Sequence, residues 1–217
     1  MLIPVKDSVI LPFGVPNIAI NTHLHEIMAD FEHDIKECIK ALNSGGVILY
    51  PTDTIWGIGC DATNAQAIEK VYDVKNRPKN KSCIILLAEN KDVLQYVAAP
   101  HPDIIALLDE FDTPTTVIYN GAVDLPDNLV AEDGSIGIRV TNDPFCKALI
   151  KRLGKPLVST SANLSGEPSP ETFGKVSAAI VKAVDYVVKY RQDDDVIRQP
   201  SRLVKIDDEA NIIVLRP

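Results

Sequence analysis

The sequence lacks the short motifs that most often show how a protein binds phosphate or attacks a substrate. Neither G-x-x-x-x-G-K-[ST] nor a strand-linked G-x-G-x-x-G occurs, so neither standard glycine loop can hold a phosphate. The G-x-S-x-G turn of many serine hydrolases is absent as well. A site for a nucleotide or an acyl group would have to be built in another way.

Metal-binding motifs are also missing. The four cysteines form no C-x-x-C pair and are expected to be reduced thiols in or near the core: Cys38, Cys60, Cys83 and Cys146. Three neighbouring histidines have no acidic or thiol partner at ligand spacing and indicate a surface helix or arm: His23, His25 and His33. The acidic run 193–195 is typical of a solvated loop. We therefore predict no metal site.

Long apolar runs and positive charge are scarce. No segment approaches ~18 consecutive apolar residues, and the N-terminus lacks the features of a secretory signal. A cytoplasmic location without membrane contact is the expectation. The formal net charge of -8 opposes sequence-independent binding to nucleic acid, because such binding relies on Lys and Arg neutralising phosphates. Any basic patch must be local.

The composition is that of an ordinary globular protein, with 46% hydrophobic and 24% charged residues. We find no internal repeat and no Gly/Ser-rich linker, which favours one domain over residues 31–217. Residues 1–30 contain Pro4, Pro12 and Pro16 and no sustained period. They are expected to form an extended arm packed on that domain.

Hydrophobic spacing predicts both helices and strands. Ile35, Ile39 and Leu42 predict a helix that ends at Asn43, and residues 67–72 predict a second helix that must end before the proline at 78. Further helices are expected to open at 142–144 and 169–171, where a capping residue precedes Pro. Short β-branched runs predict strands at 47–50, 83–88, 115–119, 136–140, 156–160, 185–190, 202–206 and 211–215. The result is a mixed α/β sheet flanked by helices.

The densest cluster of positive charge is KNRPKNK, with Lys75, Arg77, Lys79 and Lys81 at alternate positions. Because Pro78 disfavours helix, an extended segment would place all four cations on one side. Such a group suits phosphate, since Arg offers a planar fork and Lys a movable charge. For this run alone, a solvated loop after a helix is the simpler interpretation.

Three other segments carry groups that could bind a ligand. STSANLSG (159–166) follows an apolar strand, and ligands of open α/β sheets bind beyond such strand ends. Its alternative is a turn whose side chains bond their own backbone. Thr52 and Thr54 lie next to glycines that permit close approach of a ligand, although either could serve a turn. Arg139 interrupts an apolar strand and, if it faces inward, needs an anionic partner.

In this order, PTDTIWGIGCDA, KNRPKNKS, SIGIRV and KPLVSTSANLSGEPSP resemble the YrdC family of threonylcarbamoyl-AMP synthases, over residues 45–217. Each segment alone is a weak signal, whereas four in order at compatible spacing are specific. The resemblance implies a twisted open mixed sheet with a central, positively lined cavity. That fold agrees with the mixed pattern read from the residues.

The resemblance implies a nucleotidyltransferase that combines L-threonine, bicarbonate and ATP, with Mg²⁺ accompanying the ATP. Its products would be threonylcarbamoyl-AMP and pyrophosphate, and transferase proteins acting downstream would modify the tRNA adenosine beside the anticodon. Direct contact with tRNA or double-stranded RNA is left open. Because two anions meet when threonine carbamate attacks the α-phosphorus, cations and positioning would lower the barrier, without an enzyme nucleophile.

The same resemblance assigns residues to the two substrates. Threonine would contact Thr54, Arg139, Ser159 and Ser201, with Arg139 pairing its carboxylate. ATP would be bound by Lys75, Arg77, Lys81, Ser135, Ser161, Asn163, Ser169 and Arg216. Lys75 and Arg77 are the residues expected to act in catalysis.

Two positions depart from the family's pattern. Leu86 lies near a place where the family often has histidine, and Thr113 replaces the glycine of the usual P-G-P-[VL]-T. Because the sequence ends at Arg216-Pro217, a short form without the extra C-terminal domain of longer members is expected.

Two alternatives of other classes remain. One is a double-stranded RNA-binding module of the same type without synthase activity, which the net charge of -8 disfavours. The other is a YrdC-like carbamoyl-transfer domain of a maturation protein, which the missing zinc-finger spacings disfavour.

Overall fold

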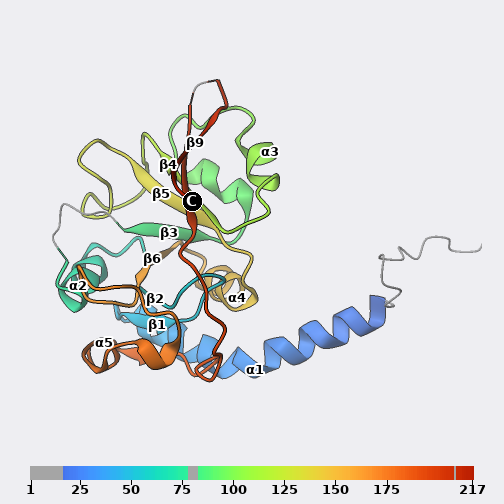
Figure 1. Ribbon diagram of the computed structural model, residues 1–217, viewed down its shortest axis with the longest axis vertical. Helices are drawn as coiled ribbons and strands as arrows, with labels where there is room; N and C mark the ends of the chain where they lie inside the picture. The colour runs from blue at the N-terminus through green and yellow to red at the C-terminus, as the bar shows by residue number, and fades with distance from the viewer. Residues whose placement is uncertain (1–16, 78–82, 208) are drawn as a thin grey trace, which may run out of the picture.

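The protein is built around one mixed sheet, as the sequence predicts. The computed structural model describes residues 17–77, 83–207 and 209–217, with side chains from Asp30 onward. Its nine strands follow the order β7-β1-β2-β6-β3-β5-β4-β8-β9, with parallel and antiparallel neighbours. Helices flank this sheet (Figure 1). The expected open α/β architecture is confirmed.

The strands are short, and each run expected as a strand overlaps one. Their bounds are β1 (Ile48–Tyr50), β2 (Gly57–Gly59), β3 (Ile84–Leu87), β4 (Thr115–Tyr119), β5 (Ile136–Val140), β6 (Leu157–Ser161), β7 (Tyr186–Val187), β8 (Arg202–Ile206) and β9 (Ile212–Arg216). The sequence did not predict β2, because Gly-Ile-Gly offers no run of β-branched residues. Its pairing with β1 and β6 makes it a strand.

Three of the helices described below, α2, α4 and α5, open at a residue whose side chain caps the first turn. The helix bounds are α1 (Asn17–Asn43), α2 (Ala65–Lys75), η1 (Asn90–Gln95), α3 (Ile104–Asp109), α4 (Pro144–Leu153), η2 (Phe173–Lys175) and α5 (Ala178–Ala183). As expected, α4 opens at Asp143, whose side chain accepts from the backbone N–H of Cys146. Among the described residues, no helix is long and apolar enough to span a membrane.

Two expectations are wrong, one for the N-terminal arm and one for a helix. The chain is helical from Asn17, so residues 17–30 are not extended, while residues 1–16 lie outside the described part of the chain. No Pro or Gly occurs between 17 and 44, and extending a helix costs less than starting one. No helix opens at 169–171 either: Thr172 is extended, and α5 begins only after Ser177 caps it.

A buried carboxylate joins α1 to the segment that follows β7. Asp34 is only 4% exposed. It accepts from the Tyr186 hydroxyl at 2.5 Å and from the backbone N–H groups of Lys189 and Tyr190 at 3.1 and 2.8 Å. Next to it, the Phe31 ring packs edge-on against Tyr190, with centroids 5.1 Å apart. The C-terminal half of α1 is therefore part of the core, and its buried carboxylate is tolerated because three donors hydrogen-bond to it.

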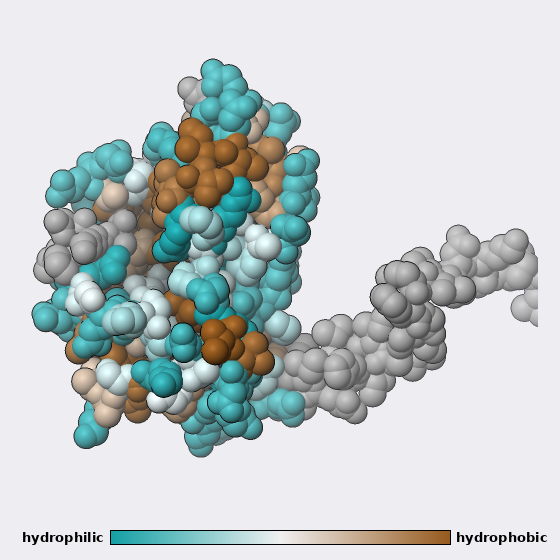
Figure 2. All heavy atoms as spheres, in the orientation of Figure 1, coloured by the Kyte–Doolittle hydropathy of each residue, from teal (hydrophilic) through white to brown (hydrophobic). Residues whose placement is uncertain are grey.

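The opposite edge of the sheet is exposed. Four consecutive apolar residues of β9, Ile212 to Leu215, are 38 to 55% exposed, and they contribute to the brown patch at the top of Figure 2. Because its side chains are not buried, β9 is held mainly by its antiparallel pairing with β8. This pairing positions Arg216 at the end of the strand.

Gly59 lies where two strands approach too closely for a side chain. A Cβ at this position would be 2.0 Å from the Val158 carbonyl oxygen. We expect Gly59→Ala to lower the free energy of unfolding by about 3 kcal/mol or more, because backbone must shift. Urea unfolding of the variant would measure this. At Gly174 a Cβ would meet nothing within 4 Å, so Gly174→Ala is the matched control, and similar losses in the two would contradict the prediction.

Candidate functional site

Segments far apart in the sequence form a pocket of about 240 Å³. It is lined by the loop after β1, the end of α2, the starts of β3 and β8, β5, β6 with its following loop, and the end of β9. Eight of the residues assigned by resemblance lie in it: Thr54, Ser159, Ser161, Ser169, Ser201, Arg77, Arg139 and Arg216. With Thr160, which also lines it, the pocket combines six hydroxyl residues with three arginines.

Strand register explains why residues from different strands meet here. β3 lies between β5 and β6 and pairs Leu86 with Arg139 and Ile84 with Ser159. Residues two apart on a strand point to the same face, so Arg139 and Ser159 share one face of the sheet. Ser161 follows Ser159 by two and lies on that face as well. Alternation along three paired strands therefore gathers the polar groups.

Lys75 lies behind the pocket rather than in its lining. It is the last residue of α2 and 1% exposed, so the extended strip of cations expected from Lys75 onward is wrong at its first position. Its ammonium group donates to the backbone carbonyl of Ser161 and, at 2.7 Å, to that of Asn163. Burial, and then the charge of Arg77, lower its pKa to about 8. Lys79 and Lys81 lie outside the described residues.

Two further assigned residues do not line this pocket. Ser135 precedes β5, and its backbone N–H donates to Asp133 at 3.0 Å. The Asn163 amide donates to the carbonyls of Leu164 and Glu167 at 3.0 and 2.6 Å. Asn163 therefore uses its side chain within its own turn, the alternative considered for this loop.

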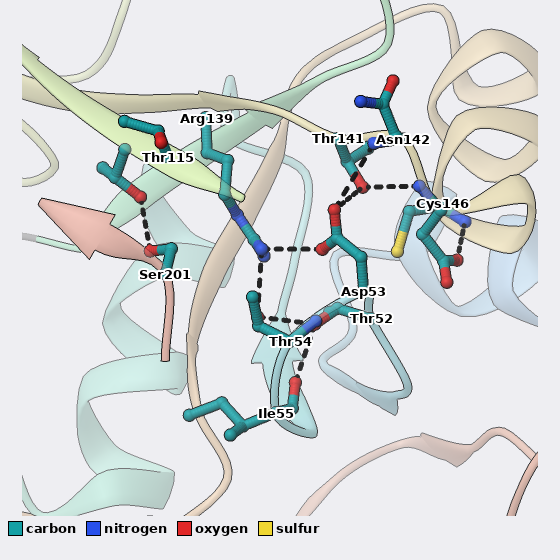
Figure 3. A network of polar contacts seen from close by, with 12 residues as sticks. Thr52, Asp53, Thr54, Ile55, Thr115, Arg139, Thr141, Asn142, Cys146 and Ser201 are labelled. Atoms are coloured by element: carbon teal, nitrogen blue, oxygen red, sulfur yellow. Dashed lines mark hydrogen bonds and ion pairs between the residues drawn. The ribbon is translucent and has the colours of Figure 1, made fainter. Parts of the chain in front are cut away.

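Arg139 faces inward and has the anionic partner that its position requires. It is 2% exposed, and its Nη1 donates to Asp53 Oδ1 at 2.6 Å and to Thr54 Oγ1 at 2.9 Å (Figure 3). Its Nε is enclosed and has no hydrogen-bond partner in the part of the chain that the structure describes. Sequence reasoning missed Asp53, although an acid between two threonines was a possible signal.

A chain of hydrogen bonds fixes the hydroxyl of Thr54. The Thr52 hydroxyl donates to the Ile55 carbonyl at 2.8 Å, so the 2.9 Å contact between Thr52 and Thr54 requires Thr54 to donate. The Thr54 oxygen accepts from Arg139. With its proton committed to Thr52, Thr54 can meet a ligand only as an acceptor.

The wall formed by the C-terminal strands is held through Ser201. Its hydroxyl lies 2.8 Å from that of Thr116, and its carbonyl accepts from Arg216 Nη2 at 2.7 Å and Nε at 3.3 Å. Ser201 is thereby fixed to β4 by its side chain and to β9 by its backbone. Arg216 is positioned at the pocket by the same contact.

The positions that depart from the family's pattern lie on different sides of Arg139. Leu86 is buried and pairs with Arg139 across the β3–β5 ladder, so it brings no polar group to the pocket. Thr113 is exposed, in a second cavity that Asp53 also lines.

An aromatic wall was not found from the sequence. Trp56 lines the pocket, and its ring lies against Phe173 with centroids 4.8 Å apart. A large ring beside the flexible Gly57 was the available signal. Trp56 is thus the aromatic residue of the pocket lining, and Phe173, which is outside that lining, packs against its ring.

The described residues contain four buried free cysteines and no group of three or more His, Cys, Asp or Glu that could hold a metal ion. The cysteines are thus the reduced core thiols that the sequence predicts. His33 and Asp193 to Asp195 form no such group, whereas His23 and His25 have no described side chains.

Comparison with protein families gives one match that covers most of the chain. A model named Sua5_yciO_yrdC, with the description "Telomere recombination", matches residues 40–217. The "Threonylcarbamoyl-AMP synthase" of Pseudoalteromonas translucida is 34% identical over 157 residues, which are 71% of this chain and 84% of that protein. The "Putative threonylcarbamoyl-AMP synthase" of Methanocaldococcus jannaschii is 33% identical over 176 residues, 81% of each chain.

Solved structures share the fold. The Sua5 protein of P. abyssi, crystallised with L-threonine, aligns with a TM-score of 0.75 at 21% identity, over 86% of this chain and 54% of that one. E. coli YciO aligns with a TM-score of 0.72 at 24% identity, over 85% and 88% of the two chains. Both likenesses concern the fold.

The pKa of Lys75 predicts a pH-dependent stability. Its folded-state pKa is lowered from 10.5 to about 8, so between these values the unfolded chain binds a proton that the folded protein has released. Stability that depends on this group therefore rises with pH across that window, by up to ~1.4 kcal/mol per pH unit. Urea unfolding of wild type and Lys75→Met at several pH values would measure the difference.

The matched control is Lys70→Met, which removes an exposed lysine from the same helix. Wild type should gain stability with pH relative to Lys75→Met and show no such gain relative to Lys70→Met. Parallel curves for the two variants would contradict the buried, destabilised charge.

Proposed function

We propose that this chain, which belongs to the Sua5/YciO/YrdC family, is an L-threonylcarbamoyladenylate synthase. It makes threonylcarbamoyl-AMP and pyrophosphate from L-threonine, bicarbonate and ATP, as a nucleotidyltransferase. The observation that carries the proposal is the pocket in which six hydroxyl residues and three arginines meet from separate segments of a chain similar to named synthases.

In this proposal, threonine lies at the sheet face near Arg139. The buried guanidinium binds the carboxylate, and the Thr54 oxygen, committed as an acceptor, takes a hydrogen bond from the substrate ammonium or hydroxyl. Ser159 and Ser201 line the same pocket and complete the polar contacts. The similar fold of a protein crystallised with L-threonine supports this assignment.

The nucleotide phosphates lie in the part of the pocket lined by Arg77, Arg216 and the serine loop, by which we mean residues 159–166. Arg77, Ser161 and Ser169 line the pocket beside the end of α2, where a guanidinium fork can pair with phosphate oxygens. Lys75 does not line the pocket but contributes indirectly. Its ammonium donates to the backbone carbonyls of Ser161 and Asn163, which fixes the loop and adds positive charge behind it. Magnesium enters as part of the substrate MgATP. Ser135, Asn163 and Lys81 keep their assignment to ATP only as expectations.

The chemistry needs positioned charge more than a reactive side chain. L-threonine and bicarbonate give the N-carbamate with loss of water, and a carbamate oxygen then bonds to the α-phosphorus. The bond from this phosphorus to the pyrophosphate oxygen breaks, and pyrophosphate leaves. Arg77 and Arg216 offset the repulsion between the two anions and the charge that grows on the leaving group. Arg139 holds the nucleophile in line.

The product is a mixed anhydride, so a transferase must consume it by moving the threonylcarbamoyl group to an acceptor. We propose that this acceptor is the tRNA adenosine beside the anticodon and that the location is the cytoplasm. Direct RNA binding without synthase activity is not favoured by the relatives, which are named synthases.

The direct test of the proposed function follows the labelled carbon. Purified protein incubated with MgATP, labelled bicarbonate and L-threonine should form labelled threonylcarbamoyl-AMP and an equal amount of pyrophosphate. Omitting threonine or bicarbonate should abolish both products. Absence of the labelled adenylate in the complete mixture would contradict the function.

Substitution of Arg77 tests the residues that we propose to bind the nucleotide phosphates. Arg77→Ala should reduce threonine- and bicarbonate-dependent pyrophosphate release by about 100-fold or more, because a cation that offsets transition-state charge is lost. Arg152→Ala is the matched control, since this exposed arginine pairs with Glu32 on the surface at 2.8 Å. Unchanged turnover in Arg77→Ala would remove this residue from the proposed mechanism.

A further inference from the structure

We propose that Asp53 is a positioning residue, which orients Arg139 so that the Nε edge of its guanidinium is presented to the carboxylate of the amino-acid substrate. This inference rests on the proposed function, because it takes the ligand of Arg139 to be an amino acid. It makes the loop between β1 and β2 a determinant of specificity for a free α-carboxylate.

Asp53 is itself held from the side opposite to Arg139. Its Oδ1 accepts from Arg139, while its Oδ2 accepts from the Thr141 hydroxyl at 3.2 Å and the Asn142 backbone N–H at 3.4 Å (Figure 3). The Thr141 oxygen in turn accepts from the backbone N–H of Asp143 at 3.1 Å. The carboxylate is therefore tied to the junction between β5 and α4 and has little freedom to turn.

The contact engages only one corner of the guanidinium. Both hydrogens of Nη1 are used, one by Asp53 and one by Thr54. Nε, on the opposite edge, is buried and has no hydrogen-bond partner among the described residues. A buried donor without an acceptor is unfavourable, so an oxygen atom placed beside Nε would stabilise the site. A ligand carboxylate is a suitable acceptor, because its two oxygens can bind the Nε edge side by side.

The geometry shows whether Asp53 orients Arg139 or competes with the ligand carboxylate for it. If Asp53 blocked the ligand, it would occupy the Nε edge, where a bidentate pair is strongest. Instead its second oxygen is committed to Thr141 and Asn142. Asp53 thus balances the charge of a guanidinium that is 2% exposed and does not itself pair with the Nε edge.

The test separates the two substrates in the kinetics of Asp53→Asn. The variant keeps the size of the side chain but weakens the contact to Nη1, so the KM for L-threonine should rise about 10- to 100-fold. The KM for ATP should change less than about threefold, because the loss is local to Arg139. Partial unfolding would lower the amount of active enzyme and kcat but not KM. Asp112→Asn is the matched control, an exposed carboxylate lining the neighbouring cavity with Asp53.

Calorimetric binding without ATP adds a readout that does not depend on turnover. Wild type should bind L-threonine more tightly than L-threoninol, which lacks the carboxylate, and Asp53→Asn should lose most of that preference. Asp53→Glu retains the charge and should recover part of the preference. If Asp53→Asn does not fold, the same comparison on Asp53→Glu decides, with an intermediate preference expected.

Three results would overturn the role of Asp53. These are tighter binding of L-threonine by Asp53→Asn, an equal loss for L-threonine and L-threoninol, or an equal rise in KM for both substrates. A wild-type protein that binds L-threonine yet makes no threonylcarbamoyl-AMP would contradict the proposed synthase function instead. The binding comparison would still test Asp53 in that case.

Discussion

The buried pair of Arg139 and Asp53 is the interaction on which the candidate site depends. A guanidinium that is 2% exposed in the middle of a sheet is tolerated only if an acid and further acceptors meet it. The acid is Asp53, in the loop after β1. Its ion pair with Arg139 holds this loop against β5, so the neighbouring Thr54 lies next to Arg139 as well. One electrostatic requirement thus joins two segments that are 85 residues apart and forms one wall of the pocket.

A second buried cation organises the other wall by a different means. Lys75 is paired with backbone carbonyls rather than with a carboxylate, so its charge is hydrogen-bonded but not neutralised. Burial therefore lowers its pKa to about 8, whereas neutralisation by an acid would oppose such a shift. Because no carboxylate of the described residues pairs with Lys75, its charge leaves a positive field behind the loop 159–166 that favours an anionic ligand. This arrangement is consistent with a phosphate on the pocket side of the loop.

The sequence predicted what local patterns determine and missed what only tertiary contacts determine. The β-branched runs and the Asp143-Pro144 cap carry their own propensity, and these elements are confirmed. Gly57–Gly59 becomes a strand because of its neighbours, since no side chain fits between Gly59 and the Val158 carbonyl. In the same way, the need of Arg139 for an anion was visible, but its identity as Asp53 depends on a loop fold that no spacing reveals. Lys75 was expected in an extended strip because alternation of charge carries no information about where a helix ends.

The walls of the described pocket differ in how firmly they are held, because some come from buried segments and one comes from an exposed strand. Arg139, Ser159 and Lys75 come from buried segments whose positions are fixed by the core. Arg216 comes from β9, whose side chains are exposed and whose attachment is the β8 ladder plus the bond to the Ser201 carbonyl. Segments with few buried apolar contacts open at lower free-energy cost than core strands. In the proposed reaction, the rigid side therefore aligns the threonine carboxylate, and the C-terminal side is the wall that can yield as a bulky nucleotide enters or leaves.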